Sequence, residues 1–152
     1  MNFKPVFEKK NLHEANYESI EKYMVPLNQM ITLRPDQPIR EAIATILKNR
    51  ISGAPVLDEQ RRLVGNLSEK DCLQIIVDKA RDKMVVENKK VSDYMSTKVF
   101  TISPTTNVVE AAIEFLSSPI RRYAVVEKGA LIGEISRREI LRAAQHIKST
   151  SW

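Results

Sequence analysis

The chain of 152 residues is poor in the residues on which many catalytic and metal sites depend, with one cysteine, two histidines and four glycines. A single cysteine excludes an internal disulfide, and Cys72 is far in sequence from both histidines, so no metal-ligand cluster is indicated. We interpret Cys72 as a small, buried apolar residue. Four glycines are too few for a glycine-rich phosphate-binding loop, and the sequence shows no plausible pair of a nucleophile and a general base. We therefore expect neither enzymatic activity, nor a bound metal, nor a required cofactor.

Long apolar runs are also missing. None approaches the roughly 18 residues that a membrane helix requires. The first thirty residues alternate charged and apolar positions and lack the apolar stretch of a secretory signal. We expect a cytoplasmic protein without membrane insertion. With 43% apolar and 28% charged residues, the composition is that of an ordinary globular chain with a real core.

The positive charge is concentrated in the second half of the chain. Residues 1–76 hold 11 basic and 10 acidic residues, whereas residues 77–152 hold 13 and 9. An excess of this kind is compatible with a phosphorylated ligand or a polyanion, and equally with an ordinary solvated face. Aromatic residues make up only 6%, which argues against stacking on single-stranded nucleic acid.

The most informative feature is an internal repeat. An offset of 69 residues carries Leu47 onto Leu116 and Ile51 onto Ile120, and an offset of 68 carries residues 63–68 onto residues 131–136. The one-residue change of register falls in the turn after Asp58, where a deletion is tolerated. Two copies predict two equivalent surfaces, and function is expected where the copies meet.

Each copy predicts the order strand, helix, two strands, helix. Apolar residues recur at helical spacing after Pro38 and again after Asn107, and each helix is followed by two short β-branched runs that read as a hairpin. A second helix is expected to begin at Ser68 and at Ser136. One unit is too short to bury its own apolar faces, so the two units are expected to pair. The strands are predicted at residues 30–33, 54–58 and 63–67 in the first copy, and at 99–102, 123–127 and 130–135 in the second.

The segments 50–58 and 63–73, repeated more loosely at 120–126 and 131–141, resemble the cystathionine-β-synthase (CBS) domain. Tyr23-Met24 and Tyr94-Met95 match the methionine that commonly opens each such domain. The resemblance predicts an α+β fold of two β-α-β-β-α units, packed through their sheets about a pseudo-twofold axis. The expected organisation is an N-terminal extension 1–22, a first domain 23–77, a linker 78–90, a second domain 91–145 and a tail 146–152.

The resemblance also implies a function. Such tandem pairs are regulatory modules, often bind AMP, ADP, ATP or a related adenosyl ligand in the clefts between the units, and usually form dimers. It therefore implies a homodimer that senses an adenine nucleotide and controls a separate protein partner. Two alternatives stay open: a nucleic-acid-binding module, which is less favoured, and a purely structural dimerisation module with empty clefts.

In the first copy, the resemblance implies that Asp71 holds the ribose and that the Ser68 hydroxyl can face a phosphate. A carboxylate can accept hydrogen bonds from both ribose hydroxyls, but serine followed by aspartate three residues later is also a helix-capping pair. The other residues assigned to adenine in this copy are Thr32, Leu33, Gly53, Ala54 and Pro55.

The second copy departs from this pattern. Ala124 replaces the expected proline, and Tyr123 is large enough to stack on a base or to fill the cleft. Ser136 and Glu139 favour a capping box over a ribose clamp. The resemblance makes Arg121, Arg122 and Arg138 the expected phosphate ligands, and a guanidinium matches phosphate geometry. An equal alternative is that these arginines are surface charges or contacts between subunits. We expect one adenosine cleft of good quality with a basic contribution from the other copy.

Overall fold

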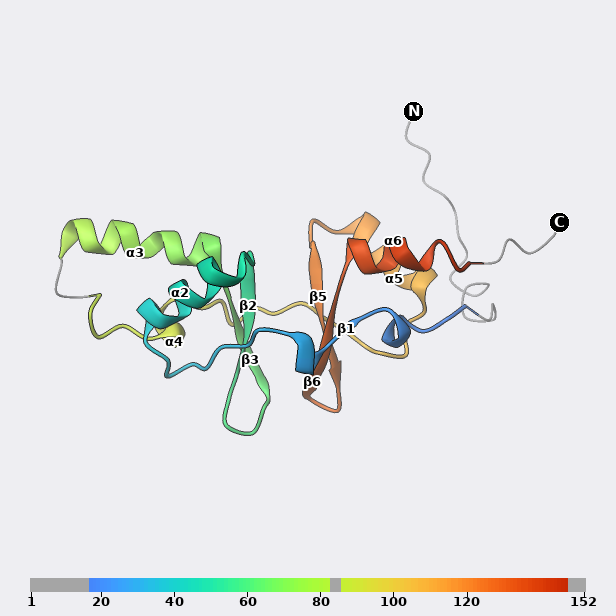
Figure 1. The fold of residues 1–152 in the computed structure, drawn as a ribbon, viewed down its shortest axis with the longest axis horizontal. Helices are drawn as coiled ribbons and strands as arrows, with labels where there is room; N and C mark the ends of the chain where they lie inside the picture. The colour runs from blue at the N-terminus through green and yellow to red at the C-terminus, as the bar shows by residue number, and fades with distance from the viewer. Residues whose placement is uncertain (1–16, 83–85, 148–152) are drawn as a thin grey trace, which may run out of the picture.

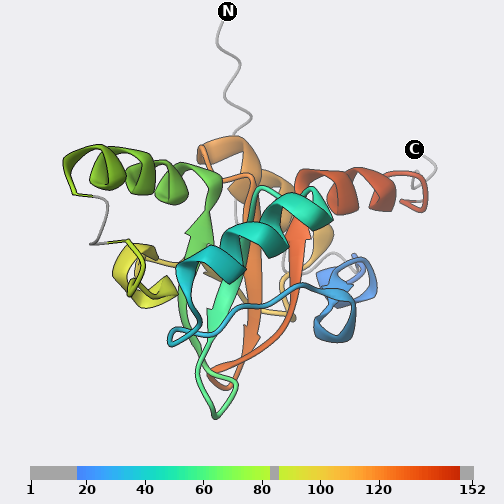
Figure 2. The same cartoon turned by 60° about the vertical axis from the view of Figure 1, so that its left-hand side comes forward.

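A computed structural model describes residues 17–82 and 86–147 of the chain. Two α/β units lie side by side, with their sheets facing each other in the middle and their main helices on the outer sides (Figure 1). The predicted α+β fold of two units packed through their sheets is confirmed. Figure 2 shows helices of both units along one edge of the molecule, while the hairpin turns project from the opposite edge.

The repeat in the sequence appears as a repeat of elements. The first unit contains α2 (Ile39–Asn49), β2 (Gly53–Leu57), β3 (Leu63–Ser68) and α3 (Glu69–Arg81). The second contains β4 (Thr101–Ile102), α5 (Val108–Ser117), β5 (Arg122–Glu127), β6 (Ala130–Ser136) and α6 (Arg137–Ala143). Ser68 and Ser136 immediately precede α3 and α6, as predicted. Each unit buries its own apolar cluster.

The first strand is shorter than predicted in both units: residues 99–102 were predicted, but β4 (Thr101–Ile102) has two residues, and the first unit has no regular strand at this position. Leu33 forms only an isolated parallel bridge with Val56, whereas the second unit has β4 paired with β5. The reason is Pro55, which has no N–H and therefore cannot donate to the chain preceding Leu33. At the matching position, Ala124 donates its N–H to Phe100 O at 3.1 Å. The replacement of proline by alanine in the second copy thus lengthens its sheet.

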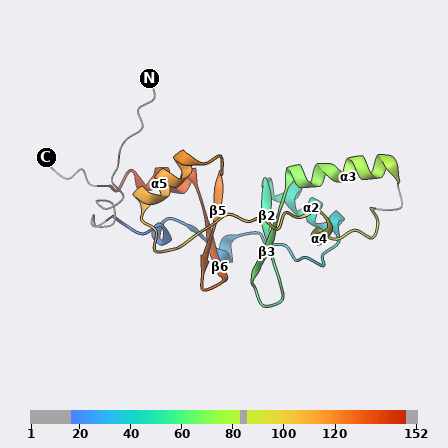
Figure 3. The same ribbon diagram turned by 180° about the vertical axis from the view of Figure 1, so that it is seen from behind.

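Each unit is completed by the segment that precedes the other unit. Residues 17–29 contain η1 (Ile20–Lys22), β1 (Val25–Pro26) and η2 (Leu27–Gln29); β1 pairs with β6, and Ile20 is fully buried in the second unit's core. In return, α4 (Val91–Tyr94) packs on the first unit, where Val91 is fully buried. Figure 3 shows α4 beside α2, with the following chain crossing to β5. Residues 1–16 of the expected N-terminal extension lie outside the described residues.

Two glycines make this exchange sterically feasible. A Cβ added at Gly133 would lie 2.5 Å from Val25 O and 2.8 Å from Met24 Sδ. At the matching Gly65, a Cβ would lie 2.7 Å from Met95 Sδ and 2.9 Å from Ser96 O. The two opening methionines therefore pack against the glycine of the opposite unit, and the exchanged segments hold the units together.

Candidate functional site

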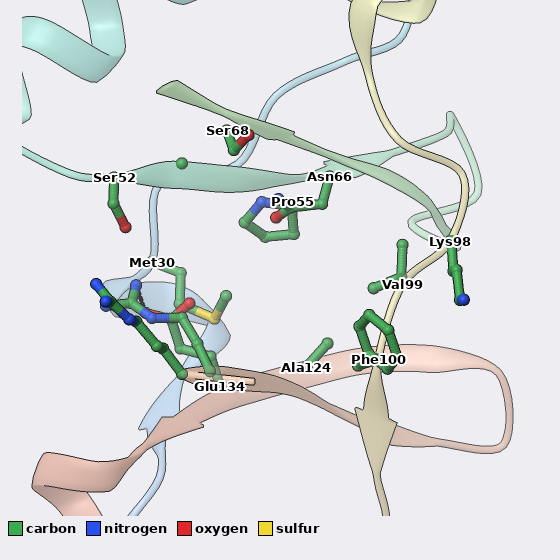
Figure 4. Close-up of a pocket in the computed structure, with 13 residues that line it drawn as sticks. Met30, Ser52, Pro55, Asn66, Ser68, Lys98, Val99, Phe100, Ala124 and Glu134 are labelled. Atoms are coloured by element: carbon green, nitrogen blue, oxygen red, sulfur yellow. Dashed lines mark hydrogen bonds and ion pairs between the residues drawn. The ribbon is translucent and has the colours of Figure 1, made fainter. Parts of the chain in front are cut away.

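A cavity of about 320 Å³ lies between the two sheets, where the copies meet (Figure 4). The volume lies near the lower end of the range for ligand sites, roughly 300 to 1,000 Å³. One wall comes mainly from β2 and β3, and the other from β5, β6 and residues 98–100, which precede β4. The lining residues are Met30, Ser52, Gly53, Pro55, Asn66, Ser68, Lys98, Val99, Phe100, Arg121, Arg122, Ala124 and Glu134.

The lining residues are largely matched pairs from the two copies. Offsets of 69 and 68 residues relate Ser52 to Arg121, Gly53 to Arg122, Pro55 to Ala124, Asn66 to Glu134 and Met30 to Val99. The cavity therefore lies near the pseudo-twofold axis and is shared by both units. Its chemistry is nevertheless asymmetric, because the first unit contributes small or neutral side chains where the second contributes charged ones.

Strand alternation decides which of the predicted residues reach this cavity. Successive side chains of a strand point to opposite faces of the sheet. On β2, Gly53 and Pro55 line the cavity, while Ala54 is buried in the core of the first unit. On β5, Arg122 lines the cavity and Tyr123 points into the core of the second unit.

Tyr123 does not line the cavity, although we expected it to stack on a base or fill the cleft. Its ring packs edge-to-face on Phe115 with centroids 5.0 Å apart, and its hydroxyl lies 2.8 Å from Ser118 Oγ. With 6% of its surface exposed, Tyr123 serves the core of the second unit in this structure.

The capping interpretation of Ser68 and Asp71 describes the local geometry well. Ser68 N–H donates to Asp71 Oδ2 at 2.9 Å, and Asp71 N–H donates to Ser68 Oγ at 3.1 Å, so the pair forms a capping box for α3. Ser68 lines the cavity as well. No hydrogen bond to Asp71 Oδ1 occurs among the described residues, so that oxygen stays available as an acceptor. Asp71 itself is not among the residues that line the cavity, so Ser68 is the member of this pair that reaches it.

The other predicted residues lie outside the central cavity. Ser136 donates its N–H to Glu139 at 2.7 Å, and its hydroxyl donates to the same carboxylate, so this pair caps α6. Arg138 is exposed on α6. Thr32 and Leu33 border a separate surface hollow of about 890 Å³ beside the β2–β3 turn. The predicted adenine-binding set is thus divided between two places.

Positive charge dominates the cavity. Arg121, Arg122 and Lys98 line it, with Glu134 as the one acidic residue of the lining. Arg122 Nη1 bonds Glu134 Oε1 at 3.0 Å. Among the described residues, no ion pair involves Arg121. The lining therefore presents cationic groups that can receive an anion. In Figure 4, Val99 and Phe100 lie beside Lys98 at one end of the cavity, and Glu134 lies toward the other end.

Glu134 was not foreseen from the sequence. Its carboxylate is largely withdrawn from water; this burial raises its pKa, while the charge and hydrogen bond of Arg122 oppose the rise. Its position in the repeat could have indicated it as a site residue, because Glu134 aligns with Asn66 and follows the repeated glycine directly.

No cluster of metal-ligating side chains occurs within residues 17–82 and 86–147. Cys72 is partly buried against the core of the first unit, and burial raises the pKa of its thiol. Over the same described ranges, no helix is both long enough and apolar enough to cross a membrane.

Comparison with known families assigns the chain. The CBS domain matches residues 20–78 and 91–146. The chain belongs to the CBS domain family. CBS domain-containing protein CBSX1, chloroplastic, of Arabidopsis thaliana is 28% identical over 156 residues, covering 86% of this chain and 65% of CBSX1. An uncharacterized protein of Methanocaldococcus jannaschii is 27% identical over 135 residues, covering 86% of this chain and 46% of that protein. The chain therefore spans about half to two thirds of these relatives.

A solved structure extends the likeness of this CBS pair. The crystal structure of CBSX2 in complex with AMP superposes with a TM-score of 0.73 at 28% identity, covering 86% of this chain and 98% of that one. CBSX2, also from Arabidopsis thaliana, is described as a CBS-pair protein. The tandem arrangement of two CBS units in one short chain is thus shared with a protein that was crystallised with an adenine nucleotide.

Proposed function

We propose that this CBS pair is a non-catalytic sensor that binds one adenine nucleotide in the central cavity and thereby controls a separate protein. The observation that carries the proposal is the shared cavity, which combines cationic residues with an apolar wall at the junction of the two units. The AMP complex of CBSX2 supports it, because that protein has the same pair of units and is 28% identical.

The cavity suggests how the ligand is oriented. The phosphate lies toward Arg121 and Arg122, since guanidinium groups match phosphate oxygens in geometry and charge. The adenine packs against Pro55, Val99 and Phe100. Ser68 Oγ is a proposed polar partner of the ligand at the cavity wall. The free oxygen of Asp71 is the ribose partner that the resemblance implies, although Asp71 is not among the lining residues. In this orientation, Thr32 and Leu33 take no part in binding.

A ligand in this position can act on the whole molecule because it contacts both units. It shifts the arrangement of the units only as far as its affinity differs between the two arrangements. We propose that the regulated partner binds the outer surface of the pair and distinguishes the two arrangements of the units. We retain a cytoplasmic location as a prediction, although CBSX1 and CBSX2 are chloroplastic by name.

We also propose a homodimer formed through the helical faces. Among the residues that the structure describes, nine large apolar residues are exposed, and seven of these lie on or just after α2, α3, α5 and α6. They include the matched pairs Leu47 with Leu116 and Leu73 with Leu141. In Figure 2, α3, α5 and α6 lie along one edge of the molecule, and α2 runs from that edge toward the middle. Because the pseudo-symmetry gives two equivalent apolar faces, a second copy related by a twofold axis would cover both at once.

Titration calorimetry with AMP, ADP and ATP tests the proposed function. Arg121→Ala should weaken binding by about tenfold or more, since a hydrogen bond to a charged group contributes about 1.5 to 3 kcal/mol. Arg62→Ala is the control, because Arg62 pairs with Asp58 at the β2–β3 turn and does not line the cavity. Failure of all three nucleotides to bind would exclude the sensor. Binding of oligonucleotides that weakens steeply with added salt would instead support the nucleic-acid alternative.

A further inference from the structure

Of the two adjacent arginines that line the cavity, only Arg122 is paired with a carboxylate, that of Glu134. Glu134 stands where the first copy has the neutral Asn66. Its side chain is 18% exposed, compared with 46% for Arg122, to which it is bonded at 3.0 Å. The anion is thus the more deeply buried member of the pair.

The sheet fixes this arrangement. Glu134 lies opposite Ala124 in the antiparallel pairing of β5 with β6, and Arg122 lies opposite Ser136. Arg122 and Ala124 are two residues apart, so their side chains leave the same face of β5. Arg122 and Glu134 are therefore diagonal neighbours on the cavity wall, a spacing that long side chains can bridge.

This ion pair limits the charge that the cavity can accept. Glu134 occupies hydrogen-bonding capacity of Arg122 that a phosphate would otherwise use, and it also repels an approaching anion. Arg121 forms no ion pair with any described residue. The two adjacent arginines consequently differ, since one is already neutralised by a carboxylate and the other is not.

We propose that Glu134 determines phosphate-number specificity at this site, restraining Arg122 so that the cavity favours a nucleoside monophosphate over a nucleoside triphosphate. The inference rests on the proposed function. A monophosphate needs only Arg121, whereas the extra phosphates of a triphosphate must lie beside Arg122 and the carboxylate. Glu134 acts through charge and through its hold on Arg122.

The test is the ratio of ATP affinity to AMP affinity, measured by calorimetry for the wild type and three variants of the full chain. Glu134→Gln keeps the shape of the side chain and removes its charge, and it should raise the ratio by about tenfold, because ATP carries roughly two more negative charges than AMP. Glu127→Gln is the matched control, because it removes the same charge from the exposed end of β5, outside the cavity. Asn66→Asp adds an acid at the matched position of the other wall and should lower the ratio.

The outcomes separate the two proposals. If neither AMP nor ATP binds any variant with an intact thermal transition, the proposed function itself fails. If both bind but Glu134→Gln leaves the ratio unchanged, or shifts it no more than Glu127→Gln does, nucleotide binding stands and the role of Glu134 is refuted. A raised ratio in Glu134→Gln together with a lowered one in Asn66→Asp supports the inference.

Discussion

The exchange of segments between the units predicts that replacing Gly133, even by alanine, lowers the stability of the folded protein. Real Cβ atoms essentially never approach other atoms closer than 3.0 Å, yet a Cβ at Gly133 would lie 2.5 Å from Val25 O. The backbone of β1 would have to move outward by at least half an ångström from β6. Overpacking of this kind costs about 1 to 3 kcal/mol. For a domain of this size, that cost lowers the melting temperature by about 2 to 12 °C.

Two other glycine substitutions calibrate this experiment. Gly65→Ala should destabilise less, because its nearest contact is the flexible end of Met95 and the carbonyl of Ser96 is 2.9 Å away. Gly129→Asn should be close to neutral, because Gly129 has a φ of +80° with nothing within 4 Å of its Cβ, and asparagine tolerates that conformation. Urea denaturation of the three variants ranks their free energies of unfolding. If Gly133→Ala is as stable as Gly129→Asn, residues 24–26 do not pack on β6 and the exchange is refuted.

Three further predictions concern the sheet, the dimer and the partly buried phenol of Tyr94. Ala124→Pro removes the N–H that bonds Phe100 O and should cost about 1 to 3 kcal/mol in urea denaturation, whereas Pro55→Ala should cost less; equal stabilities would contradict our explanation of the strand lengths. Leu116→Glu should convert the proposed dimer to a monomer in analytical ultracentrifugation and Tyr17→Glu should not, so a variant that stays dimeric would place the interface elsewhere. The Tyr94 hydroxyl donates a hydrogen bond to Asp78 at 2.7 Å, so Tyr94→Phe should lower the free energy of unfolding by about 1 kcal/mol at neutral pH. Partial burial, and secondly the carboxylate of Asp78, raise the pKa of Tyr94 to about 12. Because the raised pKa stabilises only the protonated phenol, that difference should persist below pH 10 and disappear as the pH rises through 12; a spectrophotometric titration in which no tyrosine ionises late would oppose it.

Much of the fold followed from local patterns. The apolar spacing after Pro38 and Asn107 and the serines at positions 68 and 136 predicted the helices and their starts, because capping and amphipathicity act over a few residues. The shortened first strand of the first copy could also have been read from Pro55. The exchange of segments could not be predicted, because the sequence around the opening Tyr-Met pairs does not indicate which unit each pair packs on.

The site was predicted less completely. Of the residues predicted to bind the nucleotide, Ser68, Gly53, Pro55, Arg121 and Arg122 line the shared cavity, and their role in binding stays a prediction. Tyr123 lies in the core because it alternates with Arg122 along β5, a conclusion that strand periodicity could have supplied. The contact between Arg122 and Glu134 depends on the register between β5 and β6, which one sequence does not reveal.

A crystal structure of this chain grown with AMP tests the central claim most directly. The proposal predicts one nucleotide per chain in the central cavity, with phosphate oxygens within hydrogen-bond distance of Arg121 and the adenine beside Phe100. A nucleotide bound instead in the surface hollow beside Thr32, with the central cavity empty, would contradict it.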